Sequence, residues 1–303
     1  AIIRPNAQRQ LYEGPDGILN NATPSADTLL VTTDALTLGV PLPITLSTGQ
    51  SRLYQISVPL GATLRVKLTS DGMGATNELY LRHGAAPTSS IYDAAYQGVL
   101  AANQVAVIPS TQSGVYYLLV RGHSEPAPST PATLLAELLP LTITDVRTDF
   151  GGAASLVTTT ITGAQFKPGA LVKLIRPGIQ EFAPVASQVV DSTKILASFD
   201  LTGAPHGLYD VKVINPDGST AIVPYRFQVE QALPAEVTIG VGGPRFILAG
   251  DSGTYSVALQ NLGNVDAPYV AFTIGVPEMG RSPHLYGLPY LEFFSNVAGG
   301  PQS

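Results

Sequence analysis

Three stretches of this sequence share one short pattern: GVYYLLVRG (114–122), GLYDVKVIN (207–215) and GTYSVALQN (253–261). Each begins with a glycine, one further residue and a tyrosine, and continues as a strand-like run. A tyrosine that follows a permissive glycine at a sharp turn can bury its ring in the core and bond its hydroxyl to the backbone, which is the tyrosine corner of β-sandwiches. We therefore expect Tyr116, Tyr209 and Tyr255 to have this structural role in three separate β-modules.

The composition also favours strands. The chain has 303 residues with 30 Gly and 25 Pro, and only 13% of its residues are charged. Many turn residues and few charged ones are typical of short strands joined by turns, and they disfavour solvent-exposed helices. The sequence therefore predicts an all-β fold of tandem β-sandwich domains.

Charge and residue usage exclude several classes of function. The net charge is −6 and the arginines are dispersed, so no nucleic-acid-binding surface is expected. No apolar run approaches the roughly 18 residues of a membrane span. The absence of cysteine excludes disulfides, thiolate catalysis and cysteine-based zinc sites. The first residues show neither an initiating Met nor a signal-peptide pattern, so we expect a segment of a longer polypeptide. The low charge and the β-rich composition favour an extracellular or cell-surface location.

The polar and apolar pattern divides the chain into four parts. Residues 1–36 are rich in turn formers and predict a linker, residues 37–139 and 140–230 each predict a β-sandwich, and residues 231–303 predict a partial one with an apolar tail. Period-2 alternation predicts strands at 52–59, 62–70 and 77–84, with Glu78 and Tyr80 on a solvent-facing side. A hairpin is expected around residues 110–114 and a closing strand at 130–138.

Several stretches resemble known bacterial modules. RLYQISVPLGATLRVKL (52–68), NELYLRHGAAPT (77–88) and GVYYLLVRG resemble the pre-peptidase C-terminal domain. TTITGAQFKPGALVKLI (159–175) and GLYDVKVINPDG (207–218) resemble an immunoglobulin-like TIG module, and residues 234–278 are similar to CARDB-type adhesion modules. The resemblances imply a jelly-roll-like sandwich, then an immunoglobulin-like one, in a large exported multi-module protein whose matching domains are not catalytic.

The candidates for chemistry are few. GDSG (250–253) resembles the nucleophile loop of chymotrypsin-like proteases, but it precedes a strand and lacks a histidine context, so we interpret it as a turn. The histidines, His83, His123, His206 and His284, lie too far apart in sequence for a zinc motif. Arg82 and Arg121 are expected to form structural ion pairs with Glu78, Asp93 or Glu125.

Calcium is the one cofactor kept open, because some relatives of the first module bind it through carboxylates on the segment that precedes the sandwich. Glu13 and Asp16 lie on that segment here, and Asp71 lies in a turn. The same residue types are also ordinary turn formers. No other cofactor is expected.

The leading functional hypothesis is a non-catalytic structural or adhesive segment with a protein or cell-surface partner. The apolar tail 282–303 would provide a strand that adds to an unpaired sheet edge, and such strand addition is a route to self-assembly. The alternative is an accessory targeting or substrate-binding region of a secreted peptidase or glycosidase. Glycan binding is a third hypothesis, because the first module is rich in tyrosine: Tyr54, Tyr80, Tyr92, Tyr96 and Tyr117.

Overall fold

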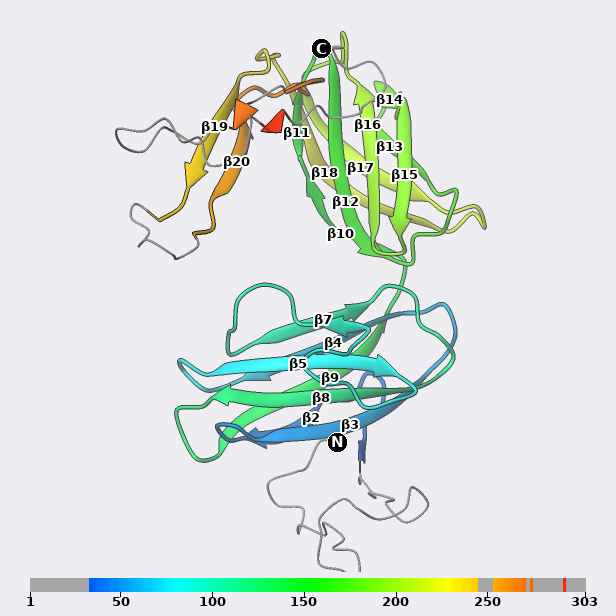
Figure 1. The fold of residues 1–303 in the computed structure, drawn as a ribbon. Coiled ribbons are helices and arrows are strands. Elements are labelled where there is room, and N and C mark those ends of the chain that lie inside the picture. The colour runs from blue at the N-terminus through cyan, green and yellow to red at the C-terminus, as the bar shows by residue number, and fades with distance from the viewer. Residues whose placement is uncertain (1–32, 245–252, 271–272, 275–290, 293–303) are drawn as a thin grey trace, which may run out of the picture.

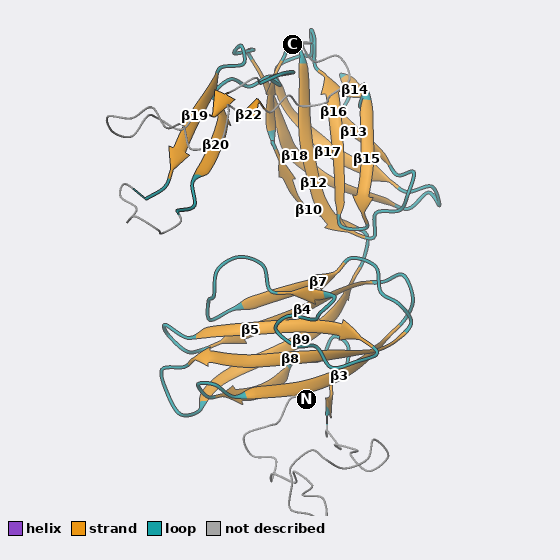
Figure 2. Cartoon of the chain, viewed as in Figure 1, coloured by secondary structure: helices purple, strands orange, loops and turns teal. Residues whose placement is uncertain are grey.

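A computed structural model of the protein describes residues 33–244, 253–270, 273–274 and 291–292. Within this part of the chain every regular element is a strand (Figure 2), and the strands form tandem β-sandwiches. The prediction of an all-β sandwich fold is confirmed. Accordingly, the described residues contain no helix long and apolar enough to cross a membrane.

The first sandwich consists of a five-stranded and a four-stranded sheet (Figure 1). The five-stranded sheet has the order β1 (Asp34–Ala35), β3 (Ser51–Val58), β8 (Gly114–Ser124), β5 (Thr76–His83) and β6 (Ala94–Ala95). The four-stranded sheet has the order β2 (Leu42–Leu46), β9 (Thr130–Leu139), β4 (Thr63–Ser70) and β7 (Gln104–Ile108). The inward residues of both sheets form one apolar core, in which Tyr54, Leu64 and Leu79 are almost fully buried, as their alternation predicted.

One predicted connection is wrong. The hairpin predicted around residues 110–114 does not form, because β7 pairs with β4 whereas β8 pairs with β3 and β5. The segment therefore crosses from one sheet to the other. Tyr116, the first inward residue of β8 after Gly114, lies just beyond this crossing.

The second sandwich has a four-stranded sheet and a five-stranded sheet of its own. The four-stranded sheet has the order β10 (Thr142–Arg147), β12 (Leu156–Ala164), β16 (Lys194–Asp200) and β15 (Ala186–Asp191). The five-stranded sheet has the order β11 (Phe150–Gly152), β18 (Thr220–Glu230), β17 (Gly207–Ile214), β13 (Leu171–Arg176) and β14 (Gln180–Phe182). This order, with the first strand divided between the two sheets, is that of an immunoglobulin-like sandwich.

The remaining described strands form two small sheets. β19 (Val237–Gly242) pairs with β20 (Ser256–Asn261), and β21 (Thr273–Ile274) pairs with β22 (Leu291–Glu292). The pairing of β22 with β21 brings residues of the predicted apolar tail beside residues 273–274; the rest of the tail lies outside the described residues. Figure 1 shows the second sandwich next to the first, with its strands running across the direction of the strands of the first, and β19 and β20 lying beside the second sandwich.

Candidate functional site: the joints between the β-modules

The joint between the first two sandwiches has a very short covalent connection. β9 ends at Leu139 and β10 begins at Thr142, so only Pro140 and Leu141 lie between the two domains. Leu141 packs against the core of the second sandwich. A two-residue connection that contains proline and is anchored at one end permits little relative rotation.

Hydrogen bonds across this joint reinforce it. The backbone N–H of Gln165 donates to Thr63 Oγ1 at 3.2 Å, and its side-chain Nε2 donates to Thr63 Oγ1 at 3.1 Å and to the Gly61 carbonyl at 3.2 Å. The Ser192 hydroxyl donates to the Pro109 carbonyl, which also accepts from Thr63 Oγ1. Thr63 itself is fully buried, so the bonds to its hydroxyl are partly shielded from competing water, whereas the bond from Gln165 Nε2 to the Gly61 carbonyl is exposed.

The second sandwich holds Gln165 in position from its own side. Gln165 has φ of 59°, in the left-handed region that few non-glycine residues adopt. The side chain of Asn215, itself buried, donates to the Gln165 carbonyl at 2.9 Å and accepts from the Lys167 N–H at 3.0 Å. Asn215 therefore fixes the turn that presents Gln165 to the first sandwich.

A second joint connects the immunoglobulin-like sandwich to the segment that follows it. Asn264 is buried, and its backbone carbonyl accepts from Gly152 N at 2.7 Å. Its side-chain amide makes two more bonds: Oδ1 accepts from Leu233 N at 2.7 Å, and Nδ2 donates to the Gln231 carbonyl at 2.8 Å. A Cβ placed on Gly152 would lie 2.4 Å from Asn264 Oδ1. The close approach at this joint therefore requires glycine at position 152.

Asp266 makes the next contact of the same joint. Its backbone N–H donates to the Leu156 carbonyl at 2.9 Å, and its carboxylate accepts from Thr158 N at 3.0 Å and from Thr158 Oγ1 at 2.6 Å. Beside these bonds lies an open groove of about 500 Å³. Its lining includes Leu156, Val237, Leu259, Pro268 and Val270.

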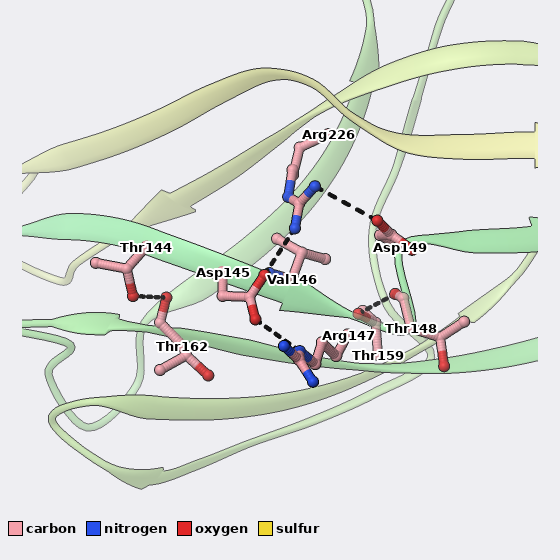
Figure 3. A network of polar contacts seen from close by, with 9 residues as sticks. All are labelled: Thr144, Asp145, Val146, Arg147, Thr148, Asp149, Thr159, Thr162 and Arg226. Carbon is pink, nitrogen blue, oxygen red and sulfur yellow. Dashed lines mark hydrogen bonds and ion pairs between the residues drawn. The ribbon is translucent and has the colours of Figure 1, made fainter. Parts of the chain in front are cut away.

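An ion-pair network joins the two sheets of the second sandwich (Figure 3). Asp145 on β10 accepts from Arg147 Nε at 2.7 Å and from Arg226 Nη2 on β18 at 2.7 Å, and Arg226 Nη1 lies 3.4 Å from Asp149. These hydrogen bonds, first from Arg147 and then from Arg226, lower the pKa of Asp145. The network is partly exposed, so it orients the strands more than it stabilises them.

The three predicted tyrosines have different surroundings. Tyr209 is fully buried at the start of β17, and its hydroxyl donates to the Pro205 carbonyl at 2.8 Å. Tyr116 is buried, and its hydroxyl accepts from the Gln112 N–H at 3.0 Å. Tyr255 departs from the expectation: its hydroxyl lies 3.1 Å from the Pro244 carbonyl, but 55% of the residue is exposed. Its side chain has no core to enter, because no sheet covers β19 and β20 among the described strands.

The tyrosine-rich face of the first sandwich also differs from the prediction. Glu78 and Tyr80 were expected to face solvent, but both are buried. The ring of Tyr80 packs with Tyr92 and Tyr96 at centroid distances of 5.3 and 5.8 Å, while Arg121 and His123 lie 3.6 and 3.1 Å from the Glu78 carboxylate. Burial and the nearby Glu78 carboxylate raise the pKa of Tyr80. Tyr54 points into the core, so the face is not an open row of rings that could bind a glycan by stacking.

The candidates for catalysis and metal binding are scattered. Glu13, Asp16, Ser252 and His284 lie outside the described residues. Asp71 is exposed in the turn after β4, where its backbone N–H donates to the Pro131 carbonyl. Across the part of the chain that the structure describes, no three His, Asp or Glu side chains come together as a metal site. Calcium binding through Glu13, Asp16 and Asp71 stays a prediction.

Sequence reasoning missed the residues that form the joints. Gln165, Ser192, Asn264 and Asp266 carry no motif, since each bonds to residues far away in the chain. The only local signal is their position in or beside turns.

No family model matches the chain. A stretch of 90 residues, 29% of this chain, is 34% identical to alkaline serine exoprotease A of Vibrio alginolyticus, and the match spans 16% of that protein. Among solved structures, the biofilm-associated protein BSP domain covers 74% of this chain and 62% of its own, with 9% identity and a TM-score of 0.25. A TM-score this low does not show a common fold.

Proposed function

We propose that this chain is a non-catalytic structural or adhesive segment of a secreted or cell-surface bacterial protein. Its role would be to hold consecutive β-modules in a defined orientation, so that a partner on another protein or a cell surface meets a fixed array. The observation that carries the proposal is the first joint, where Gln165 makes hydrogen bonds to Thr63 and Gly61 over a two-residue linker. Flexible tethering would need none of these contacts.

The proposal includes the identity of the modules. Residues 37–139 would be a pre-peptidase C-terminal domain, residues 140–230 a TIG-type module and residues 231–303 a CARDB-like module. The strand order of the second sandwich and the corner position of Tyr209 support the middle assignment. Tyr116 and Tyr209 would be the structural tyrosines of their modules.

The alternative is an accessory region of a secreted peptidase or glycosidase that targets or positions the catalytic domain. One observation favours it, namely the 90-residue similarity to a serine exoprotease. The sequence that flanks this chain in its gene distinguishes the two proposals. A catalytic domain next to the first sandwich supports the accessory role, whereas further β-modules on both sides support the structural role.

The joint can be tested directly because the chain has no cysteine. Spin labels on Ser57→Cys and Ser187→Cys, exposed residues of the first and second sandwich, report the distance between the domains by pulsed electron resonance. We expect a narrow distance distribution that broadens in Gln165→Ala and is unchanged in the control Gln180→Ala, which alters an exposed glutamine. A broad distribution in the unmodified joint would refute the proposal.

The non-catalytic part has its own test. The purified chain is expected to hydrolyse neither peptides nor glycans above the background rate. Hydrolysis that disappears in Ser252→Ala would overturn this part of the proposal.

A further inference from the structure

The hairpin of β19 and β20 has an apolar face that the described strands leave open. The register pairs Ile239 with Leu259 and Val241 with Val257, and residues paired in an antiparallel ladder share one face. Each of these four residues is at least 37% exposed. The opposite face of the two strands carries small and polar residues: Thr238, Gly240, Gly242, Ser256, Ala258 and Gln260. The hairpin is therefore amphipathic, as is usual for strands that pack against a second layer.

An open apolar face of this kind needs an occupant. A hairpin of two strands is marginally stable at best in water unless its apolar side packs against another element. Contiguous exposed apolar residues mark the places where another segment or another molecule binds. The face of Ile239, Val241, Val257 and Leu259 is therefore a binding surface.

The groove of about 500 Å³ at the second joint opens onto this surface. Val237 and Leu259 of the hairpin both line the groove, and Val237 shares the apolar face because it lies two residues from Ile239. Among the described residues that line the groove, Asp266 alone is charged, and its carboxylate already accepts two hydrogen bonds from Thr158. An uncharged, apolar segment is therefore the occupant that fits.

The chain holds such a segment next to the groove. In LYGLPYL (285–291) every residue other than the glycine and the proline is leucine or tyrosine. Its last residue, Leu291, begins β22, which pairs with β21 of the same chain, and β21 begins three residues after Val270 of the groove lining. Six extended residues span about 20 Å, so residues 285–290 match the six-residue length of β19.

We propose that residues 285–290 pack onto the apolar face of β19 and β20 and complete the third module within one chain. The proposal rests on the proposed function, in which residues 231–303 form a module of their own. Because β22 anchors the segment beside its binding surface, the effective concentration of the segment exceeds that of a second copy in solution. The apolar tail then stabilises its own module and is not a free strand for self-assembly.

Thiol accessibility tests the proposal in the full chain, which has no cysteine of its own. Leu259→Cys places a thiol on the apolar face, and Ala258→Cys places one on the opposite face of the same strand. A maleimide should react with Leu259→Cys at least about 10 times more slowly than with Ala258→Cys, because a covered thiol reacts only after local opening. Ile239→Cys and Thr238→Cys repeat the comparison on β19, so the result does not depend on one substitution.

Variants of the tail identify the occupant. Leu288→Asp puts a charge into the apolar contact and should raise the labelling rate of Leu259→Cys to that of Ala258→Cys, whereas Ser282→Asp adds the same charge outside the segment and should keep the protection. Equal labelling of Leu259→Cys and Ala258→Cys with the unmodified tail refutes the proposal, as does protection that survives Leu288→Asp. Protection that appears only at high protein concentration would make a second copy the occupant and also refutes it. These outcomes leave the distance distribution across the first joint unchanged, so they are distinct from a failure of the proposed function.

Discussion

Replacing Tyr209 with phenylalanine tests whether the tyrosine corner stabilises the second sandwich. The change removes one hydroxyl and leaves a fully buried ring in contact with Phe182, at a centroid distance of 6.0 Å. The hydroxyl donates to the Pro205 carbonyl at 2.8 Å, so the variant loses this bond and leaves that carbonyl without its donor. A net loss of about 1–2 kcal/mol in the free energy of unfolding is expected.

Two comparison variants set the scale. Tyr209→Ala also removes the ring and should cost about 3–5 kcal/mol, as truncation of a buried aromatic residue does. Tyr225→Phe removes a hydroxyl from a residue that is 67% exposed and should change stability by less than about 0.5 kcal/mol. The difference between the two phenylalanine variants isolates the corner hydrogen bond.

Hydrogen exchange measured by mass spectrometry at rising urea concentration reports the opening free energy of peptides from β17 and β18 within the whole chain. The Tyr209→Phe variant should exchange there roughly 5–30 times faster than the unmodified chain, whereas peptides of the first sandwich should not change. If Tyr209→Phe behaves like Tyr225→Phe, the hydroxyl contributes nothing and the proposed role of the corner is refuted.

Three further outcomes are expected. Gly163→Ala would place a Cβ 2.0 Å from the Thr142 carbonyl oxygen, so it should lower the free energy of unfolding of the second sandwich by about 1–3 kcal/mol, as measured by urea unfolding. The control is Gly240→Ala, whose Cβ would meet no atom closer than 3.9 Å. The folded-state pKa of Asp145 is lowered, so the stability that this carboxylate contributes is complete above its unfolded pKa near 4 and is lost as the pH falls below that value. Asp145→Asn should remove this loss of stability at acid pH. If the free energy of unfolding of Asp145→Asn falls with pH in parallel with that of the unmodified chain, the assignment is contradicted. Burial raises the pKa of both Tyr80 and Tyr209, so ultraviolet titration should show late-ionising tyrosines, and the late absorbance change should be smaller by one tyrosine in Tyr80→Phe.

Much of the fold could be predicted from local patterns. Alternation with period 2 correctly identified the strands and core faces of β3 and β4, because a half-buried strand must place every second residue in the core. The Gly-x-Tyr pattern located the starts of β8 and β17 for a similar reason, since the turn and the strand that follows it are adjacent in sequence.

The errors occur where distant residues decide the outcome. The alternation of β5 placed Glu78 and Tyr80 on a solvent-facing side, but Tyr92 and Tyr96 pack against Tyr80 there, and the neighbouring strand β8 supplies Arg121 and His123 to Glu78. Pattern gives the two faces of a strand, and only the tertiary structure decides what covers each face. Tyr255 is the opposite case: its local pattern predicts burial, but the residue is exposed because no sheet among the described strands packs against β19 and β20.

By itself, the sequence determined the all-β class, the inward faces of several strands and the starts of β8 and β17 at Gly114 and Gly207. The tertiary structure alone decided that β7 and β8 belong to different sheets and that Gln165 meets Thr63. The physical reason is distance along the chain. Strand propensity and turn chemistry act over a few residues, whereas the joints depend on side chains that chain folding brings together from as far as 108 positions apart.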